Sequence, residues 1–497
     1  MEIRYIDTRG NTHDPLTFSE ALLKGMASGG GLFVPEQLPS MTLDEIVALA
    51  KMPYAERAAF VYKRFGVDFD DEQVDELMRR SYNENFDTPD VCPVVEVADG
   101  MYVLELWHGP TCAFKDMALQ CLPVFFSACV DKQRAAGAAD NDYLIAVATS
   151  GDTGKAALQG FADREHISIV VFYPDGGVSD IQFKQMATQE GDNVCVYGVR
   201  GNFDDAQTGV KKVFGDKVIA AKLAERNIRL SSANSINWGR LVPQIVYYFA
   251  AYAQLLKAGK ITFGDKVDFC VPTGNFGDIL AGYYAKQMGL PVGKLVCASN
   301  QNNVLTDFLS TGTYTAKREF YKTTSPSMDI LVSSNLERLL YHVTGSDAEV
   351  AGLMKSLNET GRYTVRPETL KAIQESFDCG WSSEEQVAGE IRARYEKDGY
   401  LCDTHTAVAF HVAAQKKRDG VPMVVLSTAS PFKFPRSVLE ALGHTAPEND
   451  FEAMQALEEA TGRTAPASLA VLRQKAERFS TVIDPAQIAE VALGCQA

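Results

Sequence analysis

The sequence predicts an α/β protein whose core is built on parallel β-sheet. From Tyr143 onward, short runs of β-branched and aromatic residues alternate with longer amphipathic runs. Most of the short runs are followed by a segment with helical periodicity, which is the pattern of repeated βαβ units. Parallel sheets of this kind bind ligands outside the carboxyl ends of their strands, so the residues just after each strand are the first candidates for a site.

The expected strands are short, apolar and bounded by turn residues, as buried strands are. One precedes the alternating region, and seven lie within it. In chain order they are YVLEL (102–106), YLIAVAT (143–149), SIVVFYP (168–174), NVCVYGV (193–199), IRLSSA (228–233), VDFCVPT (267–273), KLVCAS (294–299) and MVVLSTA (423–429).

The rest of the chain differs from this alternating pattern. The first hundred residues are mainly helical in pattern, and the segment after Thr311 is polar before it becomes helical as far as about Tyr395. We therefore expect four parts: a mainly helical N-terminal extension (1–100), a large domain (101–145 and 230–445) with a helical insertion near 328–396, a small mobile domain that closes over substrate (146–229), and C-terminal helices (446–497).

Composition excludes several classes of function. The 497 residues carry 48 Lys and Arg against 64 Asp and Glu, a formal net charge of −16, which argues against a nucleic-acid or anionic-membrane partner. An anionic ligand would need a local concentration of donors. The most apolar window, Leu241 to Leu256, is interrupted by polar residues and is expected to be a buried helix and not a membrane span.

Cysteines and histidines point to no metal site. The ten cysteines form no CxxC pair, and they are expected to be small core side chains in a reducing cytoplasm. The seven histidines include no HExxH pair, so no protein-bound metal is expected. The charged N-terminus lacks the apolar stretch of a secretory signal, which also favours a cytoplasmic protein.

Two glycine-rich loops follow expected strands and open expected helices. They are SGDTG (Ser150–Gly154) and TGNFG (Thr273–Gly277). Glycine allows close backbone approach at such a turn, and the first N–H groups of a helix point at whatever lies before it, so each loop could hold an anion. A tight turn without any ligand is the alternative for each loop alone.

The first loop also invites a nucleotide-binding interpretation. A P-loop requires a glycine where this chain has Thr149, and a hydroxyl residue where it has Ala156. An ATP-dependent enzyme is therefore disfavoured on both counts.

A lysine in HGPTCAFKDMALQCLP, just after the strand YVLEL, is the third feature. Lys115 stands among Phe114, Ala113 and Met117. It is either an ordinary surface lysine at the start of a helix or a partly desolvated amine whose lowered pKa lets it form an imine with a carbonyl cofactor. Spacing leaves both open.

Five separated motifs, in this order, resemble those of the threonine synthases: HGPT.AFKD around Lys115, ATSGDTG, NSINWGR, PTGNFGD and LSTASPFKFP. The resemblance runs from the N-terminal YIDTRG and GGLFVPE segments to LSTASPFKFP, which is most of the chain. It implies a pyridoxal 5′-phosphate enzyme of fold type II, in the tryptophan-synthase-β-like group and its longer threonine synthase branch. That fold has two open, mostly parallel sheets flanked by helices.

The resemblance also implies which residues hold the cofactor. Lys115 is expected to join it as an imine and then to shuttle protons. Asp152 is expected near the 3′-oxygen, where many relatives have Asn, and an ionised Asp beside another anion would need a proton or a bonding partner. Thr428 matches the hydroxyl that faces the pyridine nitrogen. The further cofactor residues are Phe114 and the phosphate loop Gly274, Asn275, Phe276, Gly277 and Asp278.

For the substrate, the resemblance implies conversion of O-phospho-L-homoserine and water into L-threonine and phosphate by γ-elimination and then β-addition of water, a carbon–oxygen lyase reaction of threonine biosynthesis. Two alternatives stay open: a phospholyase giving 2-oxobutyrate, and a non-catalytic relative that binds the cofactor or a phospho-amino acid. A monomer or homodimer is expected. The substrate residues implied are Thr149, Ser150, Gly151 and Thr153 for the carboxylate, and Asn234, Ser235 and Arg240 for the phosphate.

Overall fold

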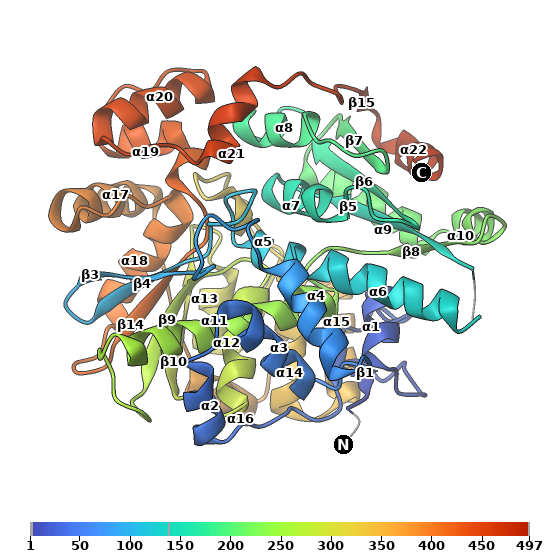
Figure 1. Cartoon of the computed structure of the whole chain (residues 1–497), viewed down its shortest axis with the longest axis horizontal. Helices are drawn as coiled ribbons and strands as arrows, with labels where there is room; N and C mark the ends of the chain where they lie inside the picture. Colours follow the sequence, from blue (N-terminus) through green and yellow to red (C-terminus); the bar gives the residue numbers. More distant parts are fainter. Residues whose placement is uncertain (1–2, 138–139, 496–497) are drawn as a thin grey trace.

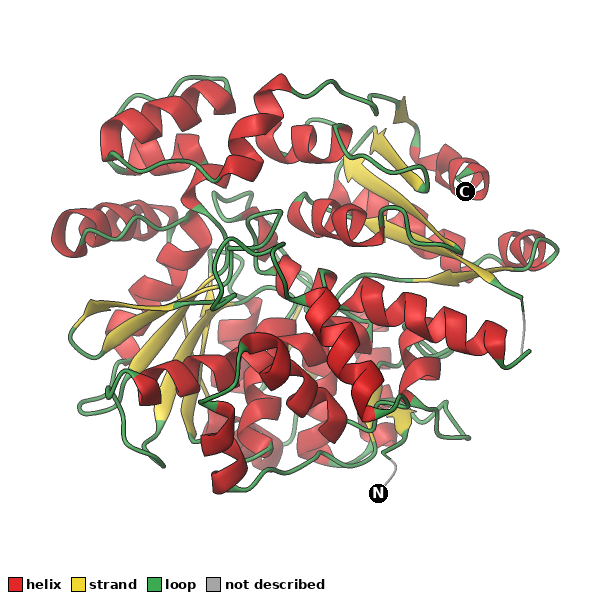
Figure 2. Cartoon of the chain, viewed as in Figure 1, coloured by secondary structure: helices red, strands yellow, loops and turns green. Residues whose placement is uncertain are grey.

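Two open sheets with helices on their faces form the framework of the chain (Figures 1 and 2). The computed structural model describes residues 3–137 and 140–495. Within that part, the first sheet has the strand order β13(Phe377–Trp381)-β10(Val292–Ser299)-β9(Val267–Pro272)-β14(Met423–Ser427)-β4(Met101–Glu105)-β3(Val94–Ala98). The second sheet has the strand order β15(Val482–Ile483)-β7(Val194–Val199)-β6(Ile167–Pro174)-β5(Asp142–Ala148)-β8(Ile228–Ser231).

All pairings in the two sheets are parallel in the described residues except that of β3 with β4. The predicted fold class is therefore confirmed, and so is each of the eight expected strands. The apolar runs are continuous because both faces of these strands are covered by helices, as the fully buried β9 and β14 illustrate. Strand β5 lies wholly in the second sheet, so the expected boundary between residues 145 and 146 runs through a strand.

Two strands of these sheets lie where helices alone were expected. β13 pairs with β10 inside the expected helical insertion, and β15 pairs with β7 inside the expected C-terminal helices. Both are edge strands that lack an apolar run: β13 is FDCGW and β15 has two residues. Edge strands are buried less than central ones, so their sequences carry a weaker signal.

The N-terminal extension is mainly helical, as expected, and packs on α11 (Trp238–Lys257). Capping boxes begin three of its helices, at Thr17, Thr42 and Asp70. Trp238, at the start of α11, is fully buried against Tyr5 and Phe65. The elements of the extension are β1 (Tyr5–Asp7), α1 (Phe18–Lys24), β2 (Phe33–Pro35), α2 (Leu43–Leu49), α3 (Tyr54–Arg64) and α4 (Asp71–Ser81).

The helix α11 contains the window Leu241–Leu256 and is buried along nearly its whole length, as predicted. In residues 3–137 and 140–495, no helix combines the length and the hydropathy that crossing a bilayer requires. The same residues contain no cluster of three or more His, Cys, Asp or Glu side chains that could hold a metal ion.

The remaining helices cover the two sheets or form the insertion. Around the sheets lie α5 (Lys115–Leu119), α6 (Leu122–Ala135), α7 (Asp152–Phe161), α8 (Asp180–Ala187), α9 (Phe203–Gly215), α10 (Lys217–Ala224), α12 (Gly277–Gln287), α13 (Val304–Thr311), α18 (Thr404–Lys416), η2 (Pro431–Lys433) and α19 (Pro435–Ala441). The insertion holds β11 (Thr313–Thr315), η1 (Pro326–Met328), α14 (Leu336–Thr344), α15 (Asp347–Thr360), β12 (Arg362–Thr364), α16 (Pro367–Ser376) and α17 (Glu384–Asp398).

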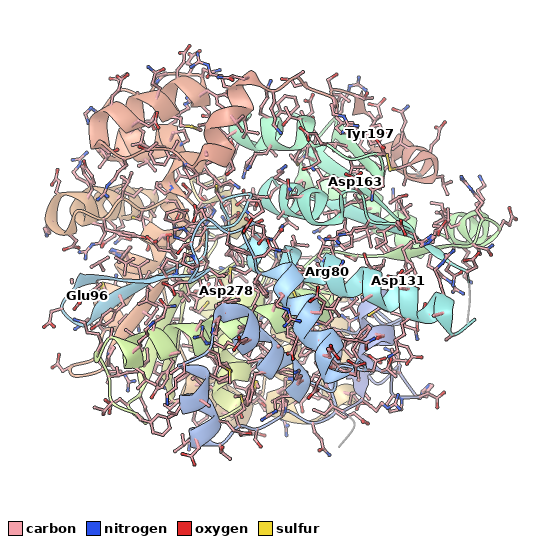
Figure 3. The ribbon with its side chains drawn as sticks, in the orientation of Figure 1. Arg80, Glu96, Asp131, Asp163, Tyr197 and Asp278 are labelled. Carbon is pink, nitrogen blue, oxygen red and sulfur yellow. A yellow bond between two sulfur atoms is a disulfide. The ribbon has the colours of Figure 1, made fainter. Side chains whose placement is uncertain are left out.

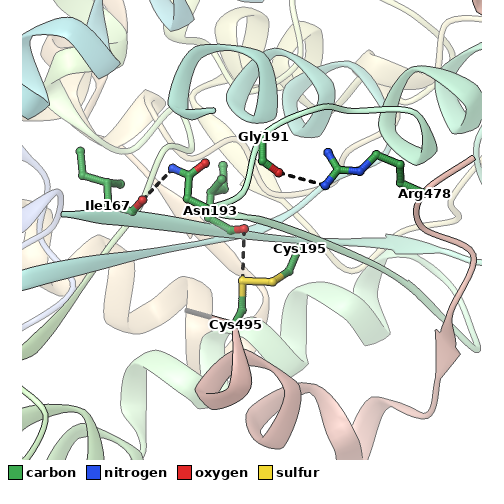
Figure 4. Close-up of a disulfide and its surroundings, with 7 residues drawn as sticks. Ile167, Gly191, Asn193, Cys195, Arg478 and Cys495 are labelled. Atoms are coloured by element: carbon green, nitrogen blue, oxygen red, sulfur yellow. Dashed lines mark hydrogen bonds between the residues drawn. A yellow bond between two sulfur atoms is a disulfide. The ribbon is translucent and has the colours of Figure 1, made fainter. Parts of the chain in front are cut away.

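The C-terminal segment runs from the first sheet across to the second (Figure 1). It contains α20 (Asp450–Thr461), α21 (Ala467–Ala470), η3 (Val471–Gln474), β15, η4 (Pro485–Gln487) and α22 (Ile488–Gly494). Arg478 donates to the carbonyl of Gly191 (Figure 4), and the N–H of Arg200 donates to the carbonyl of Ile483. These bonds fasten the segment along the edge of the second sheet.

A disulfide joins Cys195 of β7 to Cys495 at the end of α22, 300 residues further along the chain (Figure 4). The expectation that all ten cysteines are reduced core side chains is therefore wrong for these two. It is confirmed for the packing of most of the others, because seven of the eight free cysteines are buried. The two cysteines come together because β15 pairs with β7, and no local sequence pattern predicts that pairing.

We expect Cys495→Ser to lower the free energy of unfolding by about 2–4 kcal/mol under oxidising conditions, because the cross-link restricts the unfolded chain. The measurement is urea unfolding with and without dithiothreitol. Reductant should bring the wild type to the level of the variant and leave the variant unchanged. Cys379→Ser, at a half-buried free cysteine, is the matched control and should keep the wild-type response to reductant; an identical response from Cys495→Ser would contradict the assignment.

Candidate active site

Lys115 opens α5, which follows β4 after the loop 106–114. The N–H of its neighbour Phe114 donates to the carbonyl of Thr428 at 2.8 Å, and Ala113 forms a bridge with Ala429. These bonds place the amine beyond the ends of β4 and β14, where a parallel sheet binds ligands. The expectation for Thr428 is met as far as position goes; the role of its hydroxyl stays a prediction.

The lysine is buried, with 7% of its surface exposed, so the surface-lysine interpretation is wrong. Burial lowers the pKa of the Lys115 amine, because desolvation disfavours the charged form; the nearby cations Lys433 and Arg240 lower it further, and Asp152 opposes them. The amine is therefore desolvated, as the second interpretation requires, and its imine with a cofactor stays a prediction. Nζ lies 3.4 Å from Asp152 Oδ2 and donates to Ser327 Oγ at 3.2 Å.

Asp152 has the bonding partners that the sequence left open. Lys433 Nζ lies 2.6 Å from its Oδ1, and Gln182 donates to the same oxygen at 3.0 Å. Burial would raise the pKa of the Asp152 carboxyl, but Lys433 and Lys115 outweigh burial and hold the pKa well below its usual range. The Asp152 carboxylate is therefore ionised. It can accept a hydrogen bond from a ligand, and that ligand would then lie close to the two lysines.

Lys433 is a site residue that the sequence analysis missed. Its side chain is fully buried, and besides Asp152 it donates to the carbonyl of Thr111 at 2.9 Å. The residue lies inside LSTASPFKFP, a motif used for Thr428 alone. The available signal was a lysine between two phenylalanines just after a strand, the same setting that drew attention to Lys115.

Buried charge around these residues is predominantly positive. Lys155, on the first turn of α7, is buried against Gln189 and Gln159, and burial lowers its pKa to about 8. Asp116 accepts hydrogen bonds from Thr111, and burial raises its pKa to about 6. With all groups ionised, four cations (Lys115, Lys155, Lys433 and Arg240) outnumber three anions (Asp116, Asp152 and Asp278), which supplies a concentration of donors for an anionic ligand in a chain of net charge −16.

The turn from Gly274 to Gly277 presents unused donors. Within the described residues, none of its four backbone N–H groups makes a hydrogen bond, and α12 begins at Gly277. A Cβ on Gly274 would lie 2.8 Å from the carbonyl oxygen of Ser327, so only glycine fits there. Phe276 takes the left-handed conformation, with φ of 66°. Free N–H groups at a helix start form a cradle for an anion.

Asp278 follows this turn as the second residue of α12, and two tyrosines hold one oxygen of its carboxyl group. Tyr247 and Tyr248 of α11 both donate to Oδ1. Asp278, labelled near the centre of Figure 3, is buried, unlike Glu96 on β3. Burial raises the pKa of the Asp278 carboxyl to about 7. Its second oxygen, Oδ2, is buried and has no hydrogen-bond partner in the described residues.

The segment before α11 lies beside this turn. Asn335 connects them: its N–H donates to the carbonyl of Asn275, and its side chain donates to the carbonyl of Ser235. Arg338 donates to the carbonyl of Ile236 and so also holds the segment in place. Neither Asn335 nor Arg338 was found in the sequence, because both lie in the insertion, where no strand end marks a site.

Arg240 is a buried cation that has no acidic partner among residues 3–137 and 140–495. Only 3% of its surface is exposed, one guanidinium nitrogen donates to the carbonyl of Ala233, and Nε is buried without a partner in the described residues. Burial lowers its pKa to about 10. A buried arginine that lacks a carboxylate is costly unless an anion binds it. Asn234 and Ser235 lie in the same segment and are half-buried.

The loop SGDTG is shaped by Thr149, whose hydroxyl accepts hydrogen bonds from the N–H groups of Gly151 and Gly154. That hydroxyl therefore holds the loop together. Gly151 has φ of 135°, which other residues rarely adopt. Ser150 and Thr153 are half-buried, and their hydroxyls make no side-chain hydrogen bond in the described residues.

Pyridoxal 5′-phosphate fits this arrangement. A buried amine of lowered pKa, a turn of free N–H groups and an ionised acceptor at Asp152 lie together, since Ser327 contacts both Lys115 and Gly274. Which residue touches which group of the cofactor stays a prediction.

Comparison with known protein families gives three matches. The family model described as "Threonine synthase N terminus" matches residues 4–82, "Pyridoxal-phosphate dependent enzyme" matches residues 95–428, and "Threonine synthase, C-terminal" matches residues 406–492. Together they span the N-terminal extension, both sheets and the C-terminal segment.

Individual relatives agree with these matches. The chain is 41% identical to human "Threonine synthase-like 1" over 436 residues, which are 86% of this chain and 58% of that protein, so it spans less than two thirds of that relative. It is 40% identical to "Threonine synthase" of Pseudomonas aeruginosa over 442 residues, 88% of this chain and 90% of the relative.

Solved structures show the same likeness. A crystal structure of PLP-bound threonine synthase from Brucella melitensis matches with a TM-score of 0.88 and 39% identity, covering 99% of each chain. Threonine synthase from yeast matches with a TM-score of 0.87 and 32% identity, covering 99% of this chain and 97% of the yeast chain.

Proposed function

The chain belongs to the threonine synthase family of pyridoxal-phosphate-dependent enzymes, and we propose from this that it converts O-phospho-L-homoserine and water into L-threonine and phosphate. Its cofactor is pyridoxal 5′-phosphate. The observation that carries the proposal is Arg240, a buried guanidinium with no acidic partner and within electrostatic reach of Lys115. It suits a substrate with an anionic group close to the reacting carbons.

When bound, the cofactor supplies an electron sink that stabilises negative charge on the substrate carbons. Lys115 Nζ is the group proposed to remove the proton from the α-carbon and later to return it. A lysine can act as a base only when neutral, and burial beside Lys433 and Arg240 favours the neutral form of the amine. Asp152 accepts a hydrogen bond from Nζ and so restricts where the lone pair points.

The leaving phosphate requires fixed donors and a dry site. Arg240, with Asn234 and Ser235 nearby, is proposed to bind it, and fixed donors in a water-poor site stabilise developing charge better than water does. The segment 146–229 is proposed as the mobile small domain that brings Ser150, Gly151 and Thr153 to the substrate carboxylate. The closure would keep water from entering before phosphate leaves.

We expect Arg240→Ala to raise KM for O-phospho-L-homoserine by about 10- to 100-fold, because a charge-assisted hydrogen bond is worth about 1.5–3 kcal/mol. The Kd for pyridoxal phosphate should change little. Steady-state kinetics and cofactor titration measure the two. The matched control is Arg79→Ala, at an exposed side chain of α4. Equal weakening of substrate and cofactor would place Arg240 on the cofactor phosphate instead.

The function itself is tested by incubating the holoenzyme with O-phospho-L-homoserine and identifying the product. Threonine with an equal amount of phosphate supports the proposal. Accumulation of 2-oxobutyrate and ammonia would make the protein a phospholyase, which uses the same residues but quenches the intermediate differently. No phosphate release with bound cofactor would make it a binding protein.

The oligomeric state and the cellular location are also proposals. The family acts on a small molecule, and we propose that this chain works as a monomer or homodimer in the cytoplasm. The eight free cysteines fit a reducing compartment, whereas the Cys195–Cys495 disulfide is of a kind that is rare in one. Light scattering of the holoenzyme tests the assembly, and fractionation tests the location.

A further inference from the structure

Ser327 is the second acceptor for the Lys115 amine, after Asp152. It lies in η1, and its Oγ accepts a hydrogen bond from Nζ at 3.2 Å. Its carbonyl oxygen also packs against Gly274, because a Cβ added to that glycine would lie 2.8 Å from this oxygen. One residue of the insertion therefore touches both the amine and the anion-binding turn, and none of the sequence motifs includes it.

Behind Ser327 stands a buried pair, Asp403 and His405, at the start of α18. The backbone N–H of Ser327 donates to His405 Nε2 at 3.2 Å, and His405 Nδ1 lies 2.7 Å from Asp403 Oδ2. Because Nε2 accepts a hydrogen bond, the ring proton sits on Nδ1 and is donated to Asp403. Asp403 is itself fixed by the N–H of Thr406. The pair thus determines both the tautomer and the position of His405.

We propose that Ser327 is a catalytic residue that orients the Lys115 amine, and that Asp403 and His405 are positioning residues that hold Ser327 for this task; the assignment rests on the proposed function. A neutral amine has two N–H bonds and one lone pair. With the N–H bonds directed at Asp152 and Ser327, the lone pair faces the remaining side, where a carbonyl or an acidic C–H can meet it.

The contact of His405 with Ser327 is not what keeps the insertion folded around η1. Asn300 donates to Ser325 Oγ and Asp329, and Thr404 donates to the carbonyl of Thr324 at 2.7 Å. The segment is therefore anchored on both sides of Ser327 by other bonds. What the histidine adds is a fixed acceptor for one backbone N–H, next to the hydroxyl that contacts the amine.

The experiment is a double-mutant cycle with two readouts. The first is the rate at which added pyridoxal phosphate becomes covalently attached to Lys115, followed by borohydride trapping and intact mass, with no substrate present. The second is kcat and KM in threonine formation. Because a neutral hydrogen bond is worth about 0.5–1.5 kcal/mol, Ser327→Ala should lower the attachment rate and kcat by up to about tenfold, with KM little changed.

If His405 acts through the Ser327 hydroxyl, His405→Ala should lower both rates similarly, and the double variant Ser327→Ala/His405→Ala should be no slower than Ser327→Ala. Asp403→Asn should resemble His405→Ala, because an amide donor would move the ring proton to Nε2, opposite the N–H of Ser327. His405→Gln, which keeps an acceptor, should restore part of the rate. His411→Gln on the same helix, where His411 bonds only to Gln415, is the matched control and should leave both rates unchanged.

Additive losses in the double variant, or wild-type rates in Ser327→Ala, would overturn the proposal. If His405→Ala does not fold, as a melting curve will show, Asp403→Asn and His405→Gln decide the question because they change shape little. If the wild type makes no threonine, the proposed function fails, yet the attachment rate still reports on the orientation of Lys115. The two failures are therefore distinguishable.

Discussion

Lys115→Ala is expected to abolish turnover, lowering kcat by about 10³-fold or more, and to abolish covalent attachment of pyridoxal phosphate. General base catalysis by a positioned group contributes about 10²–10⁴-fold, and here the same amine is proposed to attach the cofactor. The measurements are phosphate release and intact mass after borohydride reduction. The reduced variant should carry no cofactor.

The companion variant is Lys115→Arg, which keeps a cation beside Asp152 but cannot become a neutral base. It should lose as much activity as Lys115→Ala while retaining more stability. Full turnover by either variant would remove Lys115 from the mechanism. Activity in Lys115→Arg alone would mean that the charge, and not the base, is what the reaction needs.

The central architecture could be predicted from sequence because strands buried on both faces have continuous apolar sequences. YLIAVAT and VDFCVPT are examples, and each leads into a glycine-rich turn and a helix. The edge strands β13 and β15 were missed for the opposite reason, since they are short and hold few apolar residues. The disulfide depends on where β15 returns, so it could not be predicted before the topology was known.

The candidate site divides in the same way. Residues directly after strands, such as Lys115, Asp152 and Gly274, were within reach because strand ends meet at one edge of a sheet. Ser327 and Asn335 come from the insertion, which reaches the site through tertiary packing alone. Lys433 is intermediate: it follows β14 closely, but its function depends on Asp152, which opens α7 after β5 of the other sheet.

Breaking the buried pair formed by Lys433 and Asp152 should cause the largest loss of stability of any single substitution in the site. Both side chains are at most 1% exposed, and their charged atoms are 2.6 Å apart. Lys433→Met removes one cation while leaving Asp152 buried, and breaking a buried pair in this way costs about 3–5 kcal/mol. We expect that loss in the free energy of unfolding of the apoenzyme, measured by urea denaturation at neutral pH.

The pH dependence separates lost charge pairing from lost packing. In the wild type the pKa of Asp152 lies below its value in the unfolded chain, so its contribution to stability is present at neutral pH and is lost as the pH falls through the lowered folded value. Without Lys433, burial is opposed only by Lys115 and the hydrogen bond from Gln182, and the folded pKa should rise. Acidification should therefore cost Lys433→Met less stability than it costs the wild type, because the gap between the folded and unfolded pKa of Asp152 is narrower.

The decisive variant is Lys433→Met combined with Asp152→Asn. Replacing both members of a buried pair by neutral groups of similar shape is often close to neutral in stability, so the double variant should recover most of the 3–5 kcal/mol. It should not recover activity, because Asp152 is also needed as an ionised acceptor beside the Lys115 amine. Stability that stays low in the double variant would show that Lys433 contributes through packing and its bond to Thr111, and full recovery of activity would show that the charge of Asp152 is not used by the enzyme.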